Sequence, residues 1–152
     1  MTLLLFVPLC DAPLIFGQAK PFTNRPPNGD QSLEMTTIGE GHLFGRHAAF
    51  RTYETADHTE ALVWYGKFQS AQEAKRGTKQ SLKEHTVTSK EHIKDMNGRV
   101  IGDRITATPK QESKAFMVIQ KQGLNYWIIQ SISLPVAMQV AGLIEPPPDD
   151  KR

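Results

Sequence analysis

The fold is decided by the stretch SAQEAKRGTKQSLKEHT at residues 70–86, which predicts a capped helix. Ser70 can accept from the amide of Glu73, and the Glu73 carboxylate can reach back to the amide of Ser70. Small side chains dominate the stripe at helical spacing, which comprises Ala71, Ala74, Thr78, Leu82 and His85. We therefore expect this helix to lie close to a sheet that supplies the large side chains. Gly77 either permits that close packing or stands on the solvent side, and we favour the solvent side.

Strand candidates stand on both sides of the helix. Ala61–Phe68 (ALVWYGKF) is apolar at both parities, which is typical of a central strand. Val87–Asp95 and Arg99–Pro109 predict a hairpin, because Asn97-Gly98 is a preferred pair for a two-residue turn. We expect two strands joined tightly after the helix.

The expected turn sets a register for this hairpin. Counting back from Asn97-Gly98 places His92 opposite Asp103, and Glu91 opposite Arg104. Opposite charges in cross-strand pairs stabilise a hairpin, so this register is self-consistent. It leaves apolar residues mismatched, and a bulge near Gly102 would repair the mismatch.

A second hairpin is predicted from Lys114–Gln120 and Leu124–Ser131, joined by a three-residue loop, Lys121-Gln122-Gly123. Both strands are apolar on both faces, so each face needs a cover. Ser133–Ala141 follows as a short C-terminal helix, with Ser133 as its cap.

We therefore expect an α+β fold in which an antiparallel meander of four to five strands packs on one main helix. The order β-α-β-β-β-β over residues 61–131 resembles the cystatin-like fold, which implies a curved sheet wrapped around one helix. Inhibitory cystatins carry Gln-x-Val-x-Gly in their first hairpin, whereas this turn reads Asp95-Met96-Asn97-Gly98. The resemblance therefore implies an architecture and does not extend to protease inhibition.

The chain divides into four parts by composition. We expect a leader at residues 1–19, a Pro/Gly-rich arm at 20–55, an α+β domain at 56–145 and an extended tail at 146–152. Ala48–Tyr53 is a candidate extra strand inside the arm. Cys10 is the only cysteine, so no disulfide can form within the chain.

The leader predicts export. Met1–Leu9 is almost wholly apolar, and Gly17-Gln18-Ala19 has the small-x-small pattern of a signal-peptidase site. The absence of a basic residue before Lys20 argues for the alternative, a cytoplasmic protein whose apolar arm packs on the core. A transmembrane helix needs about 20 apolar residues, so no span is expected.

The formal net charge of +2 is too small to argue for nucleic acid or an anionic membrane by itself. A weak nucleic-acid binder remains an alternative, in which the basic helix flank (Lys75, Lys79 and Lys83) meets phosphates together with Lys90 and Lys94, and aromatic side chains stack on bases. The candidate binding residues that we single out are Trp64, Tyr65, Tyr126, Trp127, Lys75, Lys79 and Lys83.

Two polar groupings invite a chemical interpretation. Glu40, His42 and His47, followed by Asp57, His58 and Glu60, include metal-ligand types, but their spacing favours loop histidines, and we expect no metal and no cofactor. His92 beside Asp103 could form an oriented general base, with Ser89, Thr106 and Thr108 as the nearest hydroxyls. No catalytic motif accompanies the pair, so a surface ion pair is the favoured interpretation.

Function is not determined by these patterns. An exported, non-catalytic binding or association module agrees best with them, because one helix cannot cover both faces of the predicted sheet. Unless the termini close the free face, a second copy of the chain, another protein, a wall component or a small apolar ligand would then cover it. An enzyme that uses His92 and Asp103 is the alternative.

Overall fold

A computed structural model describes residues 32–112 and 114–143. The expected leader, Cys10 and the C-terminal tail lie outside these residues. The elements follow one another as β1 (Leu33–Leu43), β2 (Arg46–Thr55), β3 (Glu60–Lys67), α1 (Ala71–Ser81), β4 (His85–Lys94), β5 (Val100–Pro109), β6 (Phe116–Gln122), β7 (Asn125–Ser131) and α2 (Leu134–Leu143).

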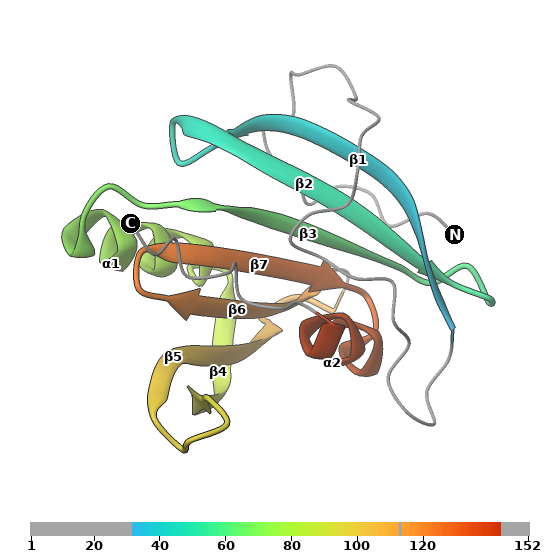
Figure 1. Cartoon of the computed structure of the whole chain (residues 1–152). Coiled ribbons are helices and arrows are strands. Elements are labelled where there is room, and N and C mark those ends of the chain that lie inside the picture. Colours follow the sequence, from blue (N-terminus) through green and yellow to red (C-terminus); the bar gives the residue numbers. More distant parts are fainter. Residues whose placement is uncertain (1–31, 113, 144–152) are drawn as a thin grey trace.

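All seven strands form one antiparallel sheet in the order β1-β2-β3-β7-β6-β5-β4 (Figure 1). Two meanders, β1-β2-β3 and β4-β5-β6-β7, join where β3 pairs with β7. The α+β class and the antiparallel sheet are confirmed. The described chain contains no helix long and apolar enough to cross a membrane.

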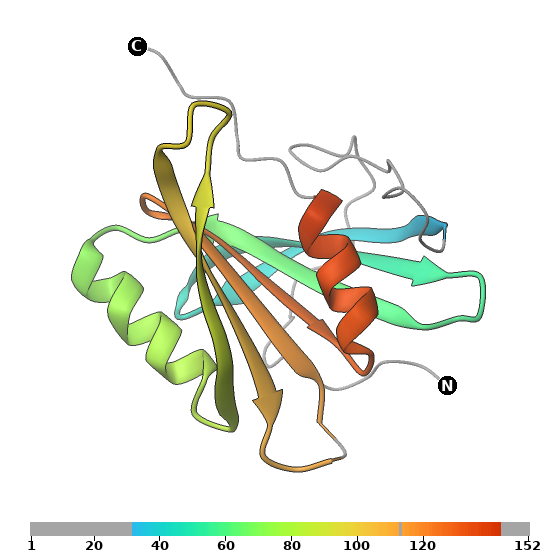
Figure 2. The same cartoon turned by 90° about the horizontal axis from the view of Figure 1, so that it is seen from below.

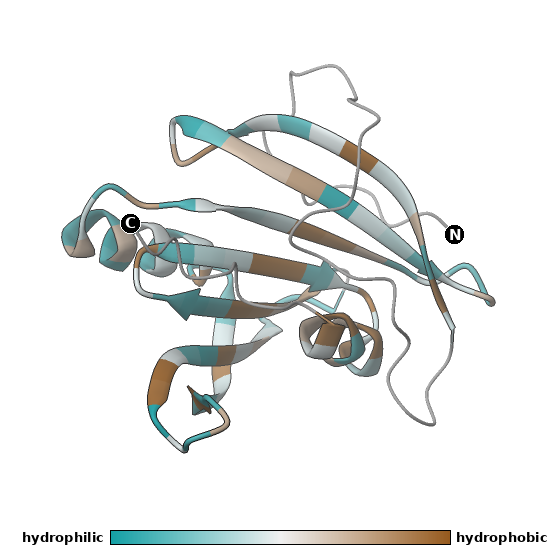
Figure 3. Ribbon diagram, in the orientation of Figure 1, coloured by the Kyte–Doolittle hydropathy of each residue, from teal (hydrophilic) through white to brown (hydrophobic). Residues whose placement is uncertain are grey.

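The two helices cover opposite faces of the sheet (Figure 2). Val63 and Ile129 pack with α2, whereas Leu62 and Ile128, one residue earlier in each strand, belong to the core under α1. Neighbouring residues of a strand point to opposite faces, so the strands that are apolar at both parities serve two cores. Figure 3 shows the hydrophobic stretches in the middle of β3 and β7 and along α2.

The expected four to five strands, one main helix and one-sided sheet are therefore corrected. Three strands precede α1, and α2 covers the face that was expected to stay free. β1 was missed because Gly39 and Gly41 argued for a linker. A Cβ at Gly39 would lie 2.4 Å from the tip of the Phe50 ring, its partner on β2. Only glycine at this position leaves room for that ring.

The cap of α1 is confirmed, with one partner changed. Ser70 Oγ accepts from the amide of Glu73 at 3.1 Å. The Glu73 carboxylate accepts from the amide of Gln69 at 2.6 Å, in place of Ser70, and it also accepts from Arg46 at the start of β2. The hydrogen bond from Gln69 and then the one from Arg46 hold the pKa of the Glu73 carboxyl below its usual value.

The helix ends at Ser81, five residues before the expected end at Thr86. His85 begins β4, where it pairs with Pro109 and its Nε2 lies 2.8 Å from the carbonyl oxygen of Ala115. Long-range strand pairing therefore prevails over the helical pattern of the last turn. Gly77 is buried and not on the solvent side, since a Cβ there would lie 2.7 Å from the Phe68 ring.

Both hairpins have turns that differ from the expected ones. In β4-β5 the turn is one residue longer, because the Asp95 amide donates to the Arg99 carbonyl. A register shift between Ile93 and Lys94 cancels the extra residue, so the predicted pairs of His92 with Asp103 and Glu91 with Arg104 are confirmed. In β6-β7 the pairing of Gln122 with Asn125 leaves a two-residue turn in place of three.

The C-terminal helix has the expected cap. The Ser133 side chain accepts from the amide of Val136 at 3.4 Å, and α2 runs on through Gly142 to Leu143.

Candidate functional site

The four aromatic candidates do not form one surface. Trp64 and Tyr126 lie under α1, whereas Tyr65 and Trp127 face α2. Because side chains alternate between the two faces along a strand, Trp64 and Tyr65 on β3 point to opposite faces, and so do Tyr126 and Trp127 on β7. Trp64, Tyr126 and Trp127 are buried, so these three rings offer no face for stacking on bases.

Tyr126 is held within an aromatic cluster. Its ring centroid lies 4.5 Å from that of Phe68 and 5.9 Å from that of Phe44. Burial, with a smaller contribution from the charge of Glu73, raises the pKa of the Tyr126 hydroxyl to about 12. This phenol therefore stays neutral at physiological pH.

The Tyr65 ring lies against the buried Arg51 side chain. The Arg51 guanidinium lies 5.5 Å from the centroid of the Tyr65 ring, in the range of a cation–π contact. Burial raises the pKa of neighbouring Tyr53, and the positive charge of Arg51 opposes that shift. A fully buried arginine on an interior strand carried no signal in the sequence, because it stands within a mixed polar stretch.

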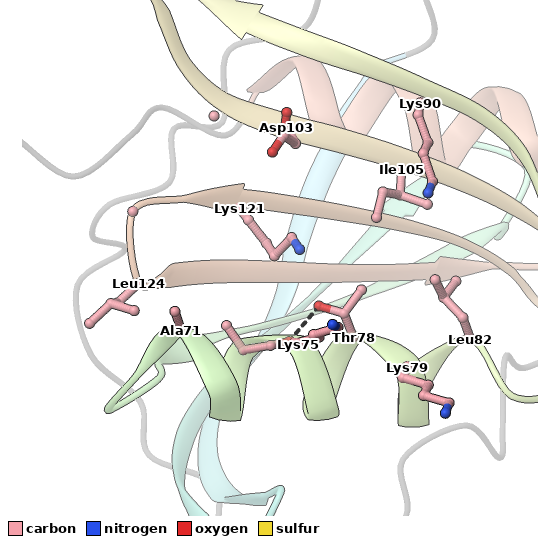
Figure 4. A pocket seen from close by; sticks show the side chains of 13 residues that line it. Ala71, Lys75, Thr78, Lys79, Leu82, Lys90, Asp103, Ile105, Lys121 and Leu124 are labelled. Atoms are coloured by element: carbon pink, nitrogen blue, oxygen red, sulfur yellow. Dashed lines mark hydrogen bonds between the residues drawn. The ribbon is translucent and has the colours of Figure 1, made fainter.

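A groove with a volume of about 460 Å³ lies between α1 and strands β4, β5 and β6, beside two of the three candidate lysines (Figure 4). We call it the α1 groove. Lys75 and Lys79 line it, whereas Lys83 does not. The lining residues are Ala71, Ala74, Lys75, Thr78, Lys79, Leu82, Lys90, Gly102, Asp103, Ile105, Lys121, Gly123 and Leu124.

Helical spacing explains the side of the groove that α1 provides. Ala71, Ala74, Thr78 and Leu82 are three or four residues apart, so they share one face of the helix. The two alanines are short and leave room above the sheet. Lys75 and Lys79 stand beside this face, with aliphatic stems that can lie along apolar surface while their ammonium groups stay in water.

Strand register explains the side that the sheet provides. His92, Asp103, Lys121 and Tyr126 are successive partners across β4, β5, β6 and β7, and they form one polar row. In the neighbouring row, two residues along, Lys90 pairs with Ile105 and the row continues with isoleucines. The groove thus has an apolar floor with a charged row at one end.

Positive charge dominates the groove. Four lysines line it (Lys75, Lys79, Lys90 and Lys121), and within residues 32–112 and 114–143 none of the four forms an ion pair. The single carboxylate, Asp103, lies 2.8 Å from His92 Nδ1. In Figure 4 the ammonium groups of Lys75, Lys90 and Lys121 point toward the space between α1 and the strands, and that of Lys79 points away.

Sequence reasoning identified Lys75 and Lys79 and associated Lys90 with the same helix flank, but it missed Lys121. Lys121 was assigned to a turn, whereas it ends the alternating run that includes Met117 and Ile119 on the α1 face. That alternation was a usable signal. Lys94, which was associated with the same flank, is not among the residues that line the groove.

The His92–Asp103 pair is exposed on both sides, as a surface ion pair would be. Of the hydroxyls considered as nucleophiles, Thr106 faces the other side of the sheet, where its Oγ1 lies 3.9 Å from Met138 Sδ. The structure therefore pairs His92 with Asp103 and places Thr106 on the other face of the sheet.

The N-terminal histidines lie on strands and not in a loop. β1 pairs with β2 so that His42 lies opposite His47, with ring centroids 6.4 Å apart, and Glu40 Oε1 lies 3.6 Å from His47 Nε2. Within the described ranges, no group of three acidic, histidine or cysteine side chains has a geometry that could hold a metal ion.

What the α1 groove can do chemically follows from its lining. Apolar side chains at the floor favour a hydrophobic body, and ammonium groups at the rim favour a negative charge. The chain matches no protein-family model, no curated protein and no solved structure, so the geometry of the groove alone carries its interpretation.

Proposed function

We propose that this protein is a non-catalytic binding module whose α1 groove takes a small organic anion with an apolar body, such as a medium-chain carboxylate. The observation that carries the proposal is the combination of an apolar floor with four lysines that have no carboxylate partner in the described chain. An acid group would sit by Lys121 and Lys75, with its chain along Ile105 and Leu82.

The volume supports a ligand of this size. A water molecule takes up about 30 Å³, so about 460 Å³ holds about 15 non-hydrogen atoms. Ligand sites usually occupy about 300–1,000 Å³. At roughly 0.4 kcal/mol per atom the binding free energy would be about 6 kcal/mol, which corresponds to a Kd of tens of micromolar.

Electrostatics supports a negative head group. Unpaired ammonium groups on low-dielectric walls create a local positive potential although the whole chain carries only +2. Neutral and cationic amphiphiles of equal length gain nothing from that potential. The charge of the head group therefore distinguishes this groove from a simple hydrophobic recess.

The test is titration calorimetry with dodecanoate below its micelle concentration, with dodecanol and dodecyltrimethylammonium as matched amphiphiles. We expect binding of dodecanoate at tens of micromolar and much weaker binding of the other two. The variant Lys75→Gln/Lys121→Gln should lose about tenfold in affinity, since each contact is a charge-assisted pair at a partly desolvated site. Lys83→Gln, from the same flank of the helix region but outside the groove, is the control and should bind like the unmodified protein.

Two results would refute the proposal. Equal affinity for the three amphiphiles would leave no role for the lysines. Equal losses in Lys83→Gln and in the double variant would indicate a diffuse charge effect and no site at the groove.

We further propose that the module acts outside the cytoplasm, on the strength of the apolar Met1–Leu9 and of Gly17-Gln18-Ala19. Mass spectrometry of the N-terminus after expression in a secreting host tests this. A chain that begins at Lys20 is expected, and an intact Met1 would contradict export.

A further inference from the structure

The tip of the β4-β5 hairpin projects beyond the sheet (Figures 1 and 2). β5 pairs with β6 only from Asp103 to Ala107, and β6 ends at Gln122. Residues 93–102 therefore pair only with one another, through Ile93 with Gly102 and Lys94 with Val100. The base of this segment reaches both sides of the sheet, because Gly102 lines the α1 groove and Ile93 lies in a small recess beside Ala141 and Gly142 of α2. Residues 94–101 line neither and form the projecting tip.

Two of the four exposed large apolar side chains of the described residues lie at the tip. The Met96 side chain is as exposed as in an extended peptide (103%), and Val100 is 56% exposed. Lys94 and Arg99 flank them and are also exposed. At this exposure the two apolar side chains contribute little to the core and stay available for contact with another surface.

The one acidic residue at the tip, Asp95, is engaged by the turn. Its Oδ1 accepts from the amides of Asn97 at 2.8 Å and Arg99 at 2.9 Å. The amide of Gly98 donates to the Asp95 carbonyl at 3.0 Å. The tip is thus internally braced, and it presents apolar and basic side chains with little ordering left to lose on binding.

We propose that this hairpin tip docks on an anionic membrane surface, with Met96 inserted at the headgroup boundary and with Lys94 and Arg99 at the lipid phosphates. Charge complementarity favours this partner, because basic side chains gain from an anionic leaflet while the methionine enters the apolar region. A protein partner, including a second copy of the chain, is the competing occupant that the experiment below separates from a membrane.

Docking does not depend on the function proposed for the groove. The same hairpin nevertheless supplies Lys90, Asp103 and Ile105 to the α1 groove. A docked tip would bring the mouth of that groove to the membrane, from which an amphiphilic acid could enter it.

The test is co-sedimentation of the full chain with vesicles of phosphatidylcholine alone and of phosphatidylcholine with phosphatidylglycerol in equal amounts. We expect binding to the anionic vesicles that weakens as salt is added, and little binding to the neutral ones. Met96→Ser should lower the partition coefficient about tenfold, because one buried methionine side chain is lost from the apolar layer. Lys94→Gln/Arg99→Gln should weaken binding to anionic vesicles by a similar factor.

Matched controls lie away from the tip. Ile132→Ser removes another exposed apolar side chain, and Lys114→Gln removes an exposed charge from the opposite end of the β5 region. Both controls should bind like the unmodified chain, and circular dichroism should show that every variant is folded. The affinity of Met96→Ser for dodecanoate should equal that of the unmodified chain. This measurement therefore tests the groove separately from membrane docking.

Three results would overturn the docking proposal. The first is an unmodified chain that binds neutral and anionic vesicles equally, and the second is a Met96→Ser variant that binds anionic vesicles as tightly as the unmodified chain. A dimer that becomes a monomer in Met96→Ser would assign the tip to a second copy of the chain instead.

Discussion

Replacement of Gly77 by alanine tests how closely α1 approaches the sheet. A Cβ at this position would lie 2.7 Å from Phe68 Cε1, 3.0 Å from Phe68 Cζ and 3.4 Å from Phe44 Cδ2. The Phe68 ring is buried and stacks 4.5 Å from Tyr126, so its tip cannot move away freely. Either this ring or the helix must shift.

The expected magnitude is a difference of two terms. Overpacking a well-filled core costs about 1–3 kcal/mol. Exchange of glycine for alanine inside a helix gains about 1 kcal/mol. Gly77→Ala should therefore lower the free energy of unfolding by about 1 kcal/mol, and the melting temperature of a chain of this length by about 3 °C.

Gly142→Ala is the matched control, because it makes the same exchange inside α2. No described atom lies within 4 Å of a Cβ at Gly142. Near the end of the helix the gain should be about 0.5 kcal/mol without an opposing cost. Urea unfolding at constant m-value, followed by tryptophan fluorescence from Trp64 and Trp127, measures both variants.

The reasoning is refuted if Gly77→Ala is as stable as Gly142→Ala. A double-mutant cycle with Phe68→Leu locates the cause, because the smaller side chain makes room for the new methyl group. Gly77→Ala should then cost less in the Phe68→Leu background than alone.

The remaining predictions concern the cap and two titrating groups. Ser70→Ala removes the acceptor of the Glu73 amide and should cost about 1 kcal/mol in urea unfolding; an unchanged midpoint would contradict the cap. The lowered pKa of Glu73 shows that the folded state favours the ionised carboxylate, so this stabilisation is complete above pH 4.5, the ordinary pKa, and is lost as the pH falls through the lowered pKa. In Glu73→Gln the melting temperature should fall less steeply at acid pH. The raised pKa of Tyr126 gives a stabilisation that is complete below pH 10 and is lost as the pH rises toward about 12. The loss should amount to about 2–3 kcal/mol in the free energy of unfolding. The pH profile of stability of Tyr126→Phe should lack this loss.

Local features of the fold were predictable because their partners are close along the chain. Ser70 and Glu73 are three residues apart, and their hydrogen bond forms as soon as the helix does. The pairs of His92 with Asp103 and Glu91 with Arg104 were predicted by counting back from Asn97-Gly98 and supported by their opposite charges, although the turn is one residue longer than expected. The register survived because a bulge offset the longer turn, and the charge pairs stabilise only that register.

The candidate site was predictable only in part. Lys75 and Lys79 were identified from the flank of the helix, but Lys83 falls outside the groove because α1 ends at Ser81. Lys121 reaches the groove through the pairing of β6 with β5, and its alternation with Met117 and Ile119 indicated its face of the sheet but not which helix covers that face. The aromatic candidates were selected as a binding surface, yet alternation along each strand divides them between two cores.

The amino-acid sequence by itself determined the start of α1, the existence of both hairpins, the cap of α2 and the two-faced apolar character of the central strands. Only the tertiary structure decided that β3 pairs with β7, that α2 covers the second face and that lysines from α1, β4 and β6 surround one apolar floor. The physical reason is the range of the interactions. Caps and turns depend on hydrogen bonds between residues a few positions apart, whereas sheet order and the groove depend on packing between segments distant along the chain, whose free energy becomes favourable only when the whole core has assembled.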